Sequence, residues 1–358
     1  MKKILVVDDS ALMRRVLCDI INSDERFFVE DRATNGLEAL DLLSRKQYDG
    51  VVLDVNMPKM NGLELLKEMQ KYKISARVVM SSTDTSEGTK ITLEALELGA
   101  LDFIHKPDNV ADCRSASYKR RFLEILHVVT ESLPPVFETE VQKREVGNIS
   151  VQMTELVKKH ASSVKGRKIV AIASSTGGPK ALQSVIPLLP ASLEAPVLIV
   201  QHMPQGFTQT LAERLNLLSQ VSVKEAQEGD ILENGHVYLS MGGRHLNVVS
   251  APGGKYKIHY SDEPAREGVR PCANYMYESL RTSQYDEVIC VVMTGMGADG
   301  TKGILKLMEG KKTYVIAQAQ ETCAVYGMPR SIVNAGVVNQ IVPLDQIAQE
   351  IIINVGVK

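Results

Sequence analysis

Two serines, a threonine and two glycines stand together at the end of an apolar run, in the segment 168–185, KIVAIASSTGGPKALQSV. The apolar run is typical of a strand and the residues after the glycines of a helix, so we expect a strand, a tight turn and a helix. Such a turn places a hydroxyl where unpaired backbone N–H groups and the helix dipole favour negative charge. A serine there could act as a nucleophile whose developing oxyanion is stabilised.

Two more polar residues follow apolar runs in the same part of the chain. The run 195–200 is followed by Gln201-His202, and the run 287–293 by a glycine-rich segment that contains Asp299. If these runs are strands of one parallel sheet, their carboxyl ends meet at one edge, and Ser175, His202 and Asp299 converge. They would then supply a nucleophile, a base and an orienting carboxylate, because a triad is defined by geometry rather than by chain order.

Each of these residues also has an ordinary structural explanation. The hydroxyls of Ser174, Ser175 and Thr176 could cap a helix, and Asp299 could cap the helix expected from about residue 301. His202 could be a partly buried histidine whose hydrogen bonds are satisfied. For any one residue the structural explanation is the simpler, and only their convergence favours catalysis.

Other kinds of site fit this sequence less well. A dinucleotide site needs Gly-x-Gly-x-x-Gly in the first turn and an acidic residue after the next strand, whereas this turn has only Gly177-Gly178. The segment Gly178-Pro179-Lys180 does not match the longer phosphate-binding loop pattern. A zinc hydrolase is disfavoured, since the sequence has no His-Glu-x-x-His motif and no cluster of cysteine and histidine.

A second group of polar residues lies in the first third of the chain, again where apolar runs end. It consists of Asp8 and Asp9 after the run 3–7, Asp54 after 50–53, Ser81 after 76–80 and Lys106 after 101–104. Such runs, alternating with helical patterns, predict a parallel sheet whose carboxyl edge gathers these side chains. Carboxylates placed together repel unless a cation is present, and oxygen ligands suit Mg²⁺, while a lysine and a hydroxyl could hold phosphoryl oxygens. Taken singly, each aspartate could instead be a turn or capping residue.

The elements that position these two groups require more than one core. A chain of 358 residues predicts two domains, and 44% hydrophobic with 23% charged residues is typical of globular proteins. A net charge of −2 gives no basic footprint for nucleic acid. Five cysteines without a Cys-x-x-Cys pair favour a reduced, cytoplasmic protein. The first apolar run ends at Asp8, so no signal or membrane segment is indicated.

We predict a first domain at 1–132, a linker at 133–166 and a second domain at 167–358. The linker is polar and contains Pro134-Pro135. Within 221–260, four short alternating runs, VSVKEA, HVYLS, HLNVV and KIHY, are separated by glycine-rich turns and are typical of antiparallel hairpins. The strand and helix alternation then resumes, which predicts a doubly wound, mostly parallel α/β domain with an antiparallel hairpin.

The segments VVDDS, LDVNMPKMNG, MSS and HKP, within residues 1 to about 130, resemble the receiver domain of response regulators. The resemblance implies a flavodoxin-like fold with a five-stranded parallel sheet, in which Asp54 accepts a phosphoryl group from a histidine kinase. For Mg²⁺ it implies Asp9, Asp54 and the carbonyl of Asn56, with Asp8 in support. For the phosphoryl group it implies Ser81 and Lys106, with Phe103 as the aromatic switch position.

The segments SSTGGPKAL, QHMP, MTGMGADG and AQETCAVYGMPRS, between about 166 and 355, resemble the catalytic domain of the CheB family of chemotaxis protein-glutamate methylesterases. The resemblance implies that Ser175 is the nucleophile, His202 the base and Asp299 its partner. It also implies that the Met296 N–H belongs to the oxyanion hole and that Thr176 supports the site. Ser174 stands where the family has alanine and is therefore a rival nucleophile, but the spacing to the glycines favours Ser175.

Together the two resemblances imply a serine hydrolase activated by phosphorylation, in which the unphosphorylated receiver covers the catalytic site. It would demethylate glutamate methyl esters on chemoreceptors, releasing methanol, and deamidate glutamines, releasing ammonia. The implied partners are methylated chemoreceptors and the histidine kinase CheA, at receptor arrays but not inserted in the membrane. Mg²⁺ would be needed at the receiver, and no cofactor for the ester chemistry. The alternative is a response regulator with a non-catalytic adaptor output.

Overall fold

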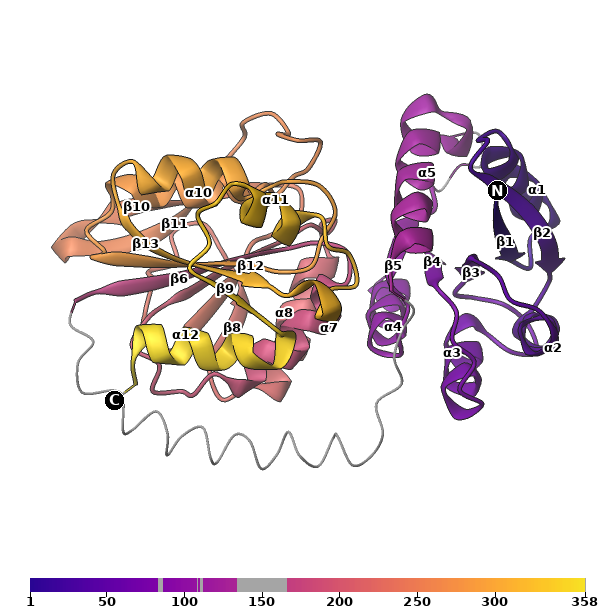
Figure 1. Cartoon of the computed structure of the whole chain (residues 1–358), viewed down its shortest axis with the longest axis horizontal. Coiled ribbons are helices and arrows are strands. Elements are labelled where there is room, and N and C mark those ends of the chain that lie inside the picture. The colour runs from indigo at the N-terminus through magenta and orange to yellow at the C-terminus, as the bar shows by residue number, and fades with distance from the viewer. Residues whose placement is uncertain (83–85, 108, 110–111, 134–165, 358) are drawn as a thin grey trace. The chain divides into compact units, whose positions relative to one another are not determined.

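The computed structural model describes residues 1–82, 86–107, 109, 112–133 and 166–357. The chain divides into two compact units, Met1–Phe137 and Glu138–Lys358 (Figure 1). Apart from its two end residues, the predicted linker 133–166 lies outside the described residues, so the predicted domain limits stay a prediction.

The N-terminal unit is a five-stranded parallel sheet with the strand order β2-β1-β3-β4-β5, as predicted. Its main elements are β1 (Lys2–Val7), α1 (Ala11–Asn22), β2 (Phe27–Ala33), α2 (Gly36–Arg45), β3 (Gly50–Asp54), α3 (Gly62–Lys71), β4 (Val78–Ser82), α4 (Ser86–Glu97), β5 (Asp102–His105) and α5 (Ala116–Glu131). The order reverses between β1 and β3, and ligands of such sheets bind beyond the carboxyl ends of the strands at that point.

The strand β2 is the one that the apolar runs of the sequence do not mark. It reads FFVEDRA and buries only its first and last residues, since it forms the edge of the sheet and exposes part of its charged middle. By contrast β3 and β4 are buried along their whole length, as expected of parallel strands covered on both faces. The apolar runs of the sequence therefore marked β1, β3, β4 and the other edge strand, β5, but not β2.

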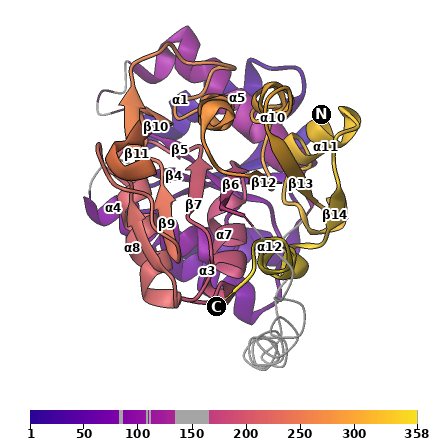
Figure 2. The ribbon, with the colours of Figure 1, turned by 90° about the vertical axis from the view of Figure 1, so that its left-hand side faces the viewer.

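The C-terminal unit contains a seven-stranded sheet, in the order β14-β13-β12-β6-β7-β9-β8, and a separate antiparallel pair, β10-β11. The strands are β6 (Lys168–Ser174), β7 (Val197–Gln201), β8 (Ser222–Glu225), β9 (His236–Leu239), β10 (His245–Ala251), β11 (Lys255–Ser261), β12 (Glu287–Val292), β13 (Lys312–Gln318) and β14 (Gln340–Val342). The helices are α7 (Gly178–Val185), α8 (Phe207–Leu218), α9 (Ala273–Ser279), α10 (Thr301–Met308), α11 (Met328–Asn334) and α12 (Ile347–Val355). Figures 1 and 2 show α10 and α11 on one face of the large sheet and α12 on the other, which is the predicted doubly wound arrangement.

The prediction of antiparallel hairpins was wrong for two of the four short runs. The runs VSVKEA and HVYLS form β8 and β9, which lie parallel to each other and to β7. Alternating polarity marks a strand but not its direction, and the ten residues between β8 and β9 reach the lower limit of length for a crossover between parallel strands. Only the runs in β10 and β11 pair antiparallel.

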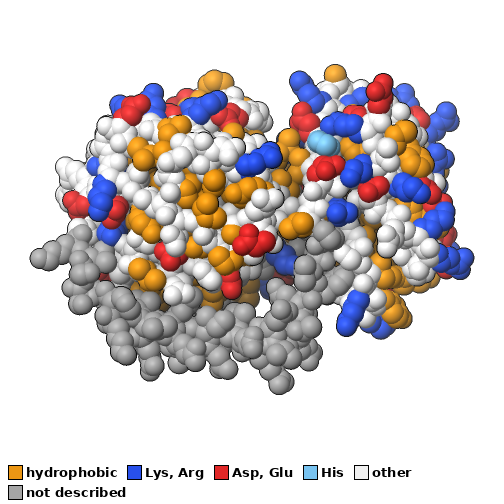
Figure 3. Space-filling model, in the orientation of Figure 1, with side chains coloured by type: hydrophobic (Ala, Val, Ile, Leu, Met, Phe, Trp, Pro, Cys, Tyr) orange, Lys and Arg blue, Asp and Glu red, His pale blue; other side chains and the backbone are white. Residues whose placement is uncertain are grey.

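The middle strands of the large sheet, β6, β7 and β12, are buried at every residue, so the residues after them emerge at a rigid edge. On the face shown in Figure 3, charges of both signs are mixed on the N-terminal unit, and apolar side chains are more frequent on the C-terminal unit. Among the described residues, no helix combines the length and apolar character needed to cross a membrane.

Candidate active site

The turn after β6 separates the two candidate serines. Ser174 is the last residue of the strand and is fully buried, and its hydroxyl donates a hydrogen bond to Oε1 of Gln201 at 2.7 Å. Ser175 is only half-buried. The Ser174 hydroxyl is thus committed to a structural contact, whereas Ser175 is the serine that a substrate could reach.

Glycine is needed in two places around Ser175. Gly177 has a φ of 75°, in the left-handed region, and a Cβ there would lie 2.5 Å from the Cβ of Ala324. A Cβ on Gly295 would lie 2.7 Å from the Cβ of Ser175, so the loop after β12 runs directly against the serine. These glycines allow three loops to meet around one hydroxyl.

His202 is brought beside the serine turn by strand pairing. Ser174 and Gln201 are register partners in β6 and β7, and the N–H of His202 donates to the Ser174 carbonyl at 3.1 Å. The Gln201 amide, which is almost fully buried, also donates to the Ser175 carbonyl at 2.9 Å. One side chain therefore ties the serine turn to the histidine loop.

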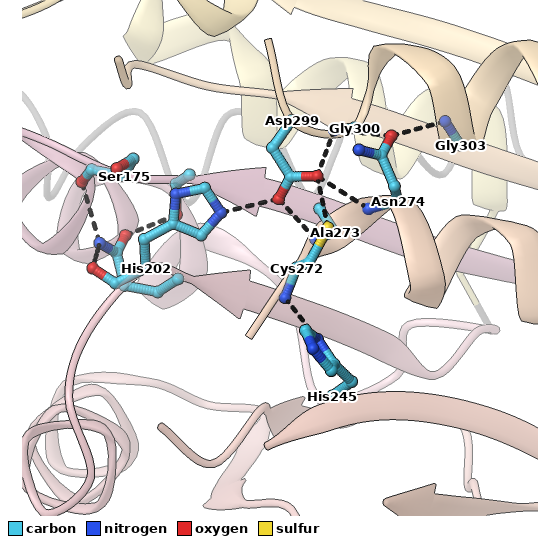
Figure 4. Close-up of polar contacts among 11 residues, drawn as sticks. Ser175, His202, His245, Cys272, Ala273, Asn274, Asp299, Gly300 and Gly303 are labelled. Atoms are coloured by element: carbon cyan, nitrogen blue, oxygen red, sulfur yellow. Dashed lines mark hydrogen bonds and ion pairs between the residues drawn. The ribbon is translucent and has the colours of Figure 1, made fainter. Parts of the chain in front are cut away.

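Asp299 lies in the loop between β12 and α10 and faces His202. Its Oδ2 lies 2.7 Å from Nε2 of His202, and the aspartate is only 2% exposed (Figure 4). The Oδ2 atom also accepts from the Ala273 N–H at 2.6 Å, and Oδ1 accepts from the Cys272 thiol at 3.0 Å, the Asn274 N–H at 3.0 Å and the Gly300 N–H at 2.9 Å. Burial alone would raise the pKa of Asp299, but these hydrogen bonds, led by that of His202, lower it below its usual value.

Asp299 does not cap the helix α10, which was the structural alternative to a catalytic role. The N–H groups of Gly300 and Gly303, where α10 begins, donate to the side-chain oxygen of Asn274 at 3.2 and 2.6 Å. Apart from the adjacent N–H of Gly300, Asp299 instead accepts donors from the start of α9 and from His202. The carboxylate is therefore aimed at the histidine.

This arrangement assigns the proton on the imidazole. An ionised carboxylate only accepts hydrogen bonds, so Nε2 of His202 must donate to Asp299. In the neutral ring Nδ1 is then without a proton and can accept one. Ser175 and His202 directly follow the register partners Ser174 and Gln201, so both side chains leave the sheet at the carboxyl ends of adjacent strands (Figure 4).

The two remaining residues implied for this site also belong to these loops. Thr176 is buried, and its carbonyl accepts a hydrogen bond from the Thr294 hydroxyl at 3.0 Å. Met296 has an exposed side chain and follows Gly295, the residue in contact with Ser175. Their roles as support and oxyanion donor stay predictions.

The acidic residues of the N-terminal unit also meet at a sheet edge. Oxygens of Asp8, Asp9 and Asp54 lie within 4.8 Å of one another, a donor set that fits a hard divalent cation. Nζ of Lys106 lies 2.8 Å from Asp8 and 2.6 Å from Asp54, and both aspartates are buried. Burial raises the pKa of Asp54, opposed by Lys106 and reinforced by Asp8. Burial lowers the pKa of Lys106, but Asp54 and Asp8 outweigh it and raise the pKa above its usual value.

Ser81 faces this cluster. It pairs in register with Asp54, so both side chains point to the same face of the sheet, whereas Ser82 points to the other. The Ser81 hydroxyl is fully buried and has no hydrogen-bond partner among the described residues, so its hydrogen-bonding capacity is unused there. Phe103 is buried in β5, and Asn56 is exposed in the loop after β3.

Sequence reasoning missed the residues that hold the candidate catalytic ones. Gln201 and Cys272 contact Ser175 and Asp299 through their side chains, and Ala273 and Asn274 contact Asp299 through backbone N–H groups. No spacing rule marks such contacts. The one signal available was that Gln201 is a polar residue at the end of a buried strand.

Comparison with known proteins agrees with this geometry. Residues 4–116 match the model of the response regulator receiver domain, and residues 170–351 match that of the CheB methylesterase. The class of protein is thus a response regulator whose output domain is an α/β esterase.

Full-length relatives have the same organisation. A protein of Geobacillus kaustophilus is 42% identical over 99% of both chains, and one of Bacillus subtilis is 39% identical over 98% of both. Both are named protein-glutamate methylesterase/protein-glutamine glutaminase. The crystal structure of the CheB methylesterase catalytic domain of Thermotoga maritima, 40% identical, covers 53% of this chain and 98% of its own, with a TM-score of 0.50. The chain belongs to the CheB methylesterase family.

Proposed function

We propose that this chain is a phosphorylation-activated serine hydrolase that demethylates glutamate methyl esters of chemoreceptors and deamidates glutamines there. The observation that carries the proposal is the buried Asp299–His202 pair beside the accessible Ser175. The names of relatives about 40% identical over the whole chain supply the substrate class. A non-catalytic adaptor is not favoured, because it would have no use for this pair.

The reaction begins when Nδ1 of His202 takes the proton of the Ser175 hydroxyl as its oxygen attacks the γ-carbonyl of the ester. Asp299 stabilises the imidazolium, and the Met296 N–H, with Thr176 supporting the loop, donates to the oxyanion. The imidazolium returns its proton to the leaving methoxide, so methanol departs and an acyl-serine remains. His202 then deprotonates a water, which attacks the acyl carbonyl, and the imidazolium returns that proton to the Ser175 oxygen as the bond to the acyl group breaks and the glutamate is released. With a glutamine side chain the leaving group is ammonia.

The receiver controls this reaction through Asp54, which accepts a phosphoryl group from a histidine kinase, CheA in the chemotaxis system. Asp8, Asp9, Asp54 and the carbonyl of Asn56 would hold Mg²⁺, which offsets the negative charge of the carboxylates and phosphoryl oxygens. Lys106 and the Ser81 hydroxyl, which has no partner among the described residues, hold the phosphoryl group. Phe103 then changes position, and the restraint on the catalytic domain is released.

We place the receiver at 1–132, the linker at 133–166 and the catalytic domain at 167–358. The protein would work in the cytoplasm, at receptor arrays and without membrane insertion. Its ester chemistry uses the chain's own side chains.

The test is methanol release from methylated receptor membranes by the full chain, with Ser175→Ala and Ser174→Ala compared. Loss of the nucleophile should reduce turnover by roughly 10⁴-fold or more. Loss of the buried Ser174 hydroxyl, which only orders Gln201, should cost less than about tenfold. Equal losses in the two variants, or full activity of Ser175→Ala, would refute the assignment of the nucleophile.

A further inference from the structure

The thiol of Cys272 lies against the catalytic carboxylate. Figure 4 shows Cys272 between Asp299 and His245. Its sulfur is 3.0 Å from Oδ1 of Asp299, which is the oxygen that does not contact His202, and the residue has no exposed surface. Because the ionised carboxylate can only accept, the thiol is the donor.

This thiol keeps its proton. Burial, with the negative charge of Asp299 as the next cause, raises the pKa of Cys272 to about 12. A buried thiol of this kind is neither a nucleophile nor a reactive group toward reagents in solution. What it offers the site is a hydrogen-bond donor that is present at every working pH.

The backbone of Cys272 is fixed from the opposite side. Its N–H donates to Nδ1 of His245 at 3.1 Å, and His245 is fully buried with its ring centroid 4.6 Å from that of Tyr275. Burial, followed by the charge of Arg270, lowers the pKa of His245, so the imidazole is neutral. The thiol is therefore held in place and does not merely fill space.

We propose that Cys272 is a positioning residue for the reaction proposed above, on which this inference rests: its thiol fixes the rotation of the Asp299 carboxylate that presents Oδ2 to His202. The torsion that turns a carboxylate is soft, so donors on Oδ1 determine where Oδ2 points. The other donors to Oδ1 are the backbone N–H groups of Asn274 and Gly300. Among the described residues, Cys272 is the side chain that donates to this oxygen.

The test compares three variants of the full chain, assayed with Mg²⁺ and a small phosphoryl donor on methylated receptor membranes. Cys272→Ala removes the donor and Cys272→Ser replaces it with a hydroxyl. Cys290→Ala is the matched control, since Cys290 is equally buried in the same unit but its thiol contacts the Val288 carbonyl, at 3.9 Å. Thermal unfolding of each variant separates loss of fold from loss of function.

We expect Cys272→Ala to lower kcat about tenfold with little change in KM. With one donor fewer, the carboxylate directs more of its charge to His202, and the acidic limb of the pH profile moves up by about half a pH unit. Cys272→Ser should restore most of both, and Cys290→Ala should match the wild type. An active wild type with an equally active Cys272→Ala, or a Cys272→Ser no better than Cys272→Ala, overturns the proposal.

Infrared spectroscopy of the S–H stretch gives a readout that does not require activity or a folded Cys272→Ala. In the folded Asp299→Asn variant, one S–H band should move to higher frequency, since the thiol loses a charged acceptor. An unchanged set of bands would overturn the contact itself. A wild type that releases no methanol, with the band shift present, would instead refute the proposed function and leave the hydrogen bond standing.

Discussion

The receiver site and the ester site each place a buried aspartate at the carboxyl edge of a parallel sheet, but the two carboxylates are compensated differently. Asp299 accepts hydrogen bonds on both oxygens, from His202, Cys272 and backbone N–H groups, and its pKa is lowered. Asp54 shares a single lysine with Asp8, and burial raises its pKa. Near it lies the hydroxyl of Ser81, for which the described part of the chain offers no hydrogen-bond partner.

The difference teaches how one architecture supports two kinds of site. In the ester site the carboxylate of Asp299 is paired with His202 and accepts further hydrogen bonds from the Cys272 thiol and from backbone N–H groups. The receiver site gathers more negative charge than the chain compensates, so a bound cation and phosphoryl group would change its energy substantially. The ester site can therefore keep one geometry, whereas the receiver site can change its energy when a ligand binds and is suited to a switch.

Among changes to the two compared aspartate sites, Asp299→Asn should have the largest effect. The carboxamide presents an N–H₂ group to donors that need an acceptor, and it no longer stabilises the imidazolium, so kcat should fall about 10³- to 10⁴-fold. Methanol release measures this. Asp345→Asn, an exposed change in the same unit, is the control. A loss of less than tenfold would mean that the pair observed here does not orient the base.

Removing the Lys106 ammonium, which Asp8 and Asp54 share, should have the next largest effect. Lys106→Met leaves the buried carboxylates of Asp8 and Asp54 without the ammonium that they share, and it should lower the free energy of unfolding of the N-terminal unit by about 3–5 kcal/mol. Urea unfolding followed by circular dichroism measures the loss, and Mg²⁺ should recover part of it. Lys46→Met breaks a more exposed pair with Asp31 and should cost about 1 kcal/mol at most. Equal losses of unfolding free energy in the two variants would mean that the buried carboxylates of the receiver depend on their lysine no more than an exposed one does.

Ser81→Ala tests whether the hydroxyl of Ser81 binds the transferred phosphoryl group. Phosphoryl incorporation from a small donor should slow about tenfold, because a hydrogen bond to the transferred group is lost. Stability should be unchanged or slightly higher, since the hydroxyl is buried and no described residue is its hydrogen-bond partner. Ser82 points to the opposite face, so Ser82→Ala should leave phosphoryl incorporation unchanged and lower the stability instead. Identical behaviour of the two serine variants would contradict the argument from strand register.

The smallest effect concerns the pH dependence of stability. The pKa of Asp299 is lowered in the folded state, so its ionised form stabilises the fold above the unfolded pKa of about 4. This contribution is lost as the pH falls through the folded-state pKa. The difference in unfolding free energy between wild type and Asp299→Asn should therefore be full at pH 7 and shrink toward pH 3. A difference in unfolding free energy that grows as the pH falls would contradict a lowered pKa of Asp299.

The sequence predicted the parts of both sites that follow buried strands. Asp54, Ser175 and His202 each terminate or follow an apolar run, and parallel pairing then forces such residues to one edge. Strand direction was harder, because β8 and β9 have the same alternating pattern as the antiparallel β10 and β11.

The supporting residues could not be predicted in the same way. Cys272 precedes α9 and meets Asp299 only because the loops before α9 and α10 pack together. The Gln201 amide likewise acts across two strands. These contacts depend on distances between elements, which periodicity and motif spacing do not encode.

The most direct test of the contrast between the two sites is methanol release by the full chain and by Asp54→Asn, with and without Mg²⁺ and a small phosphoryl donor. A preassembled ester site under a ligand-dependent switch predicts a slow basal rate in both proteins and a rise with donor and Mg²⁺ in the wild type alone. An equal rise in Asp54→Asn, or no release from the folded wild type under any condition, would contradict it.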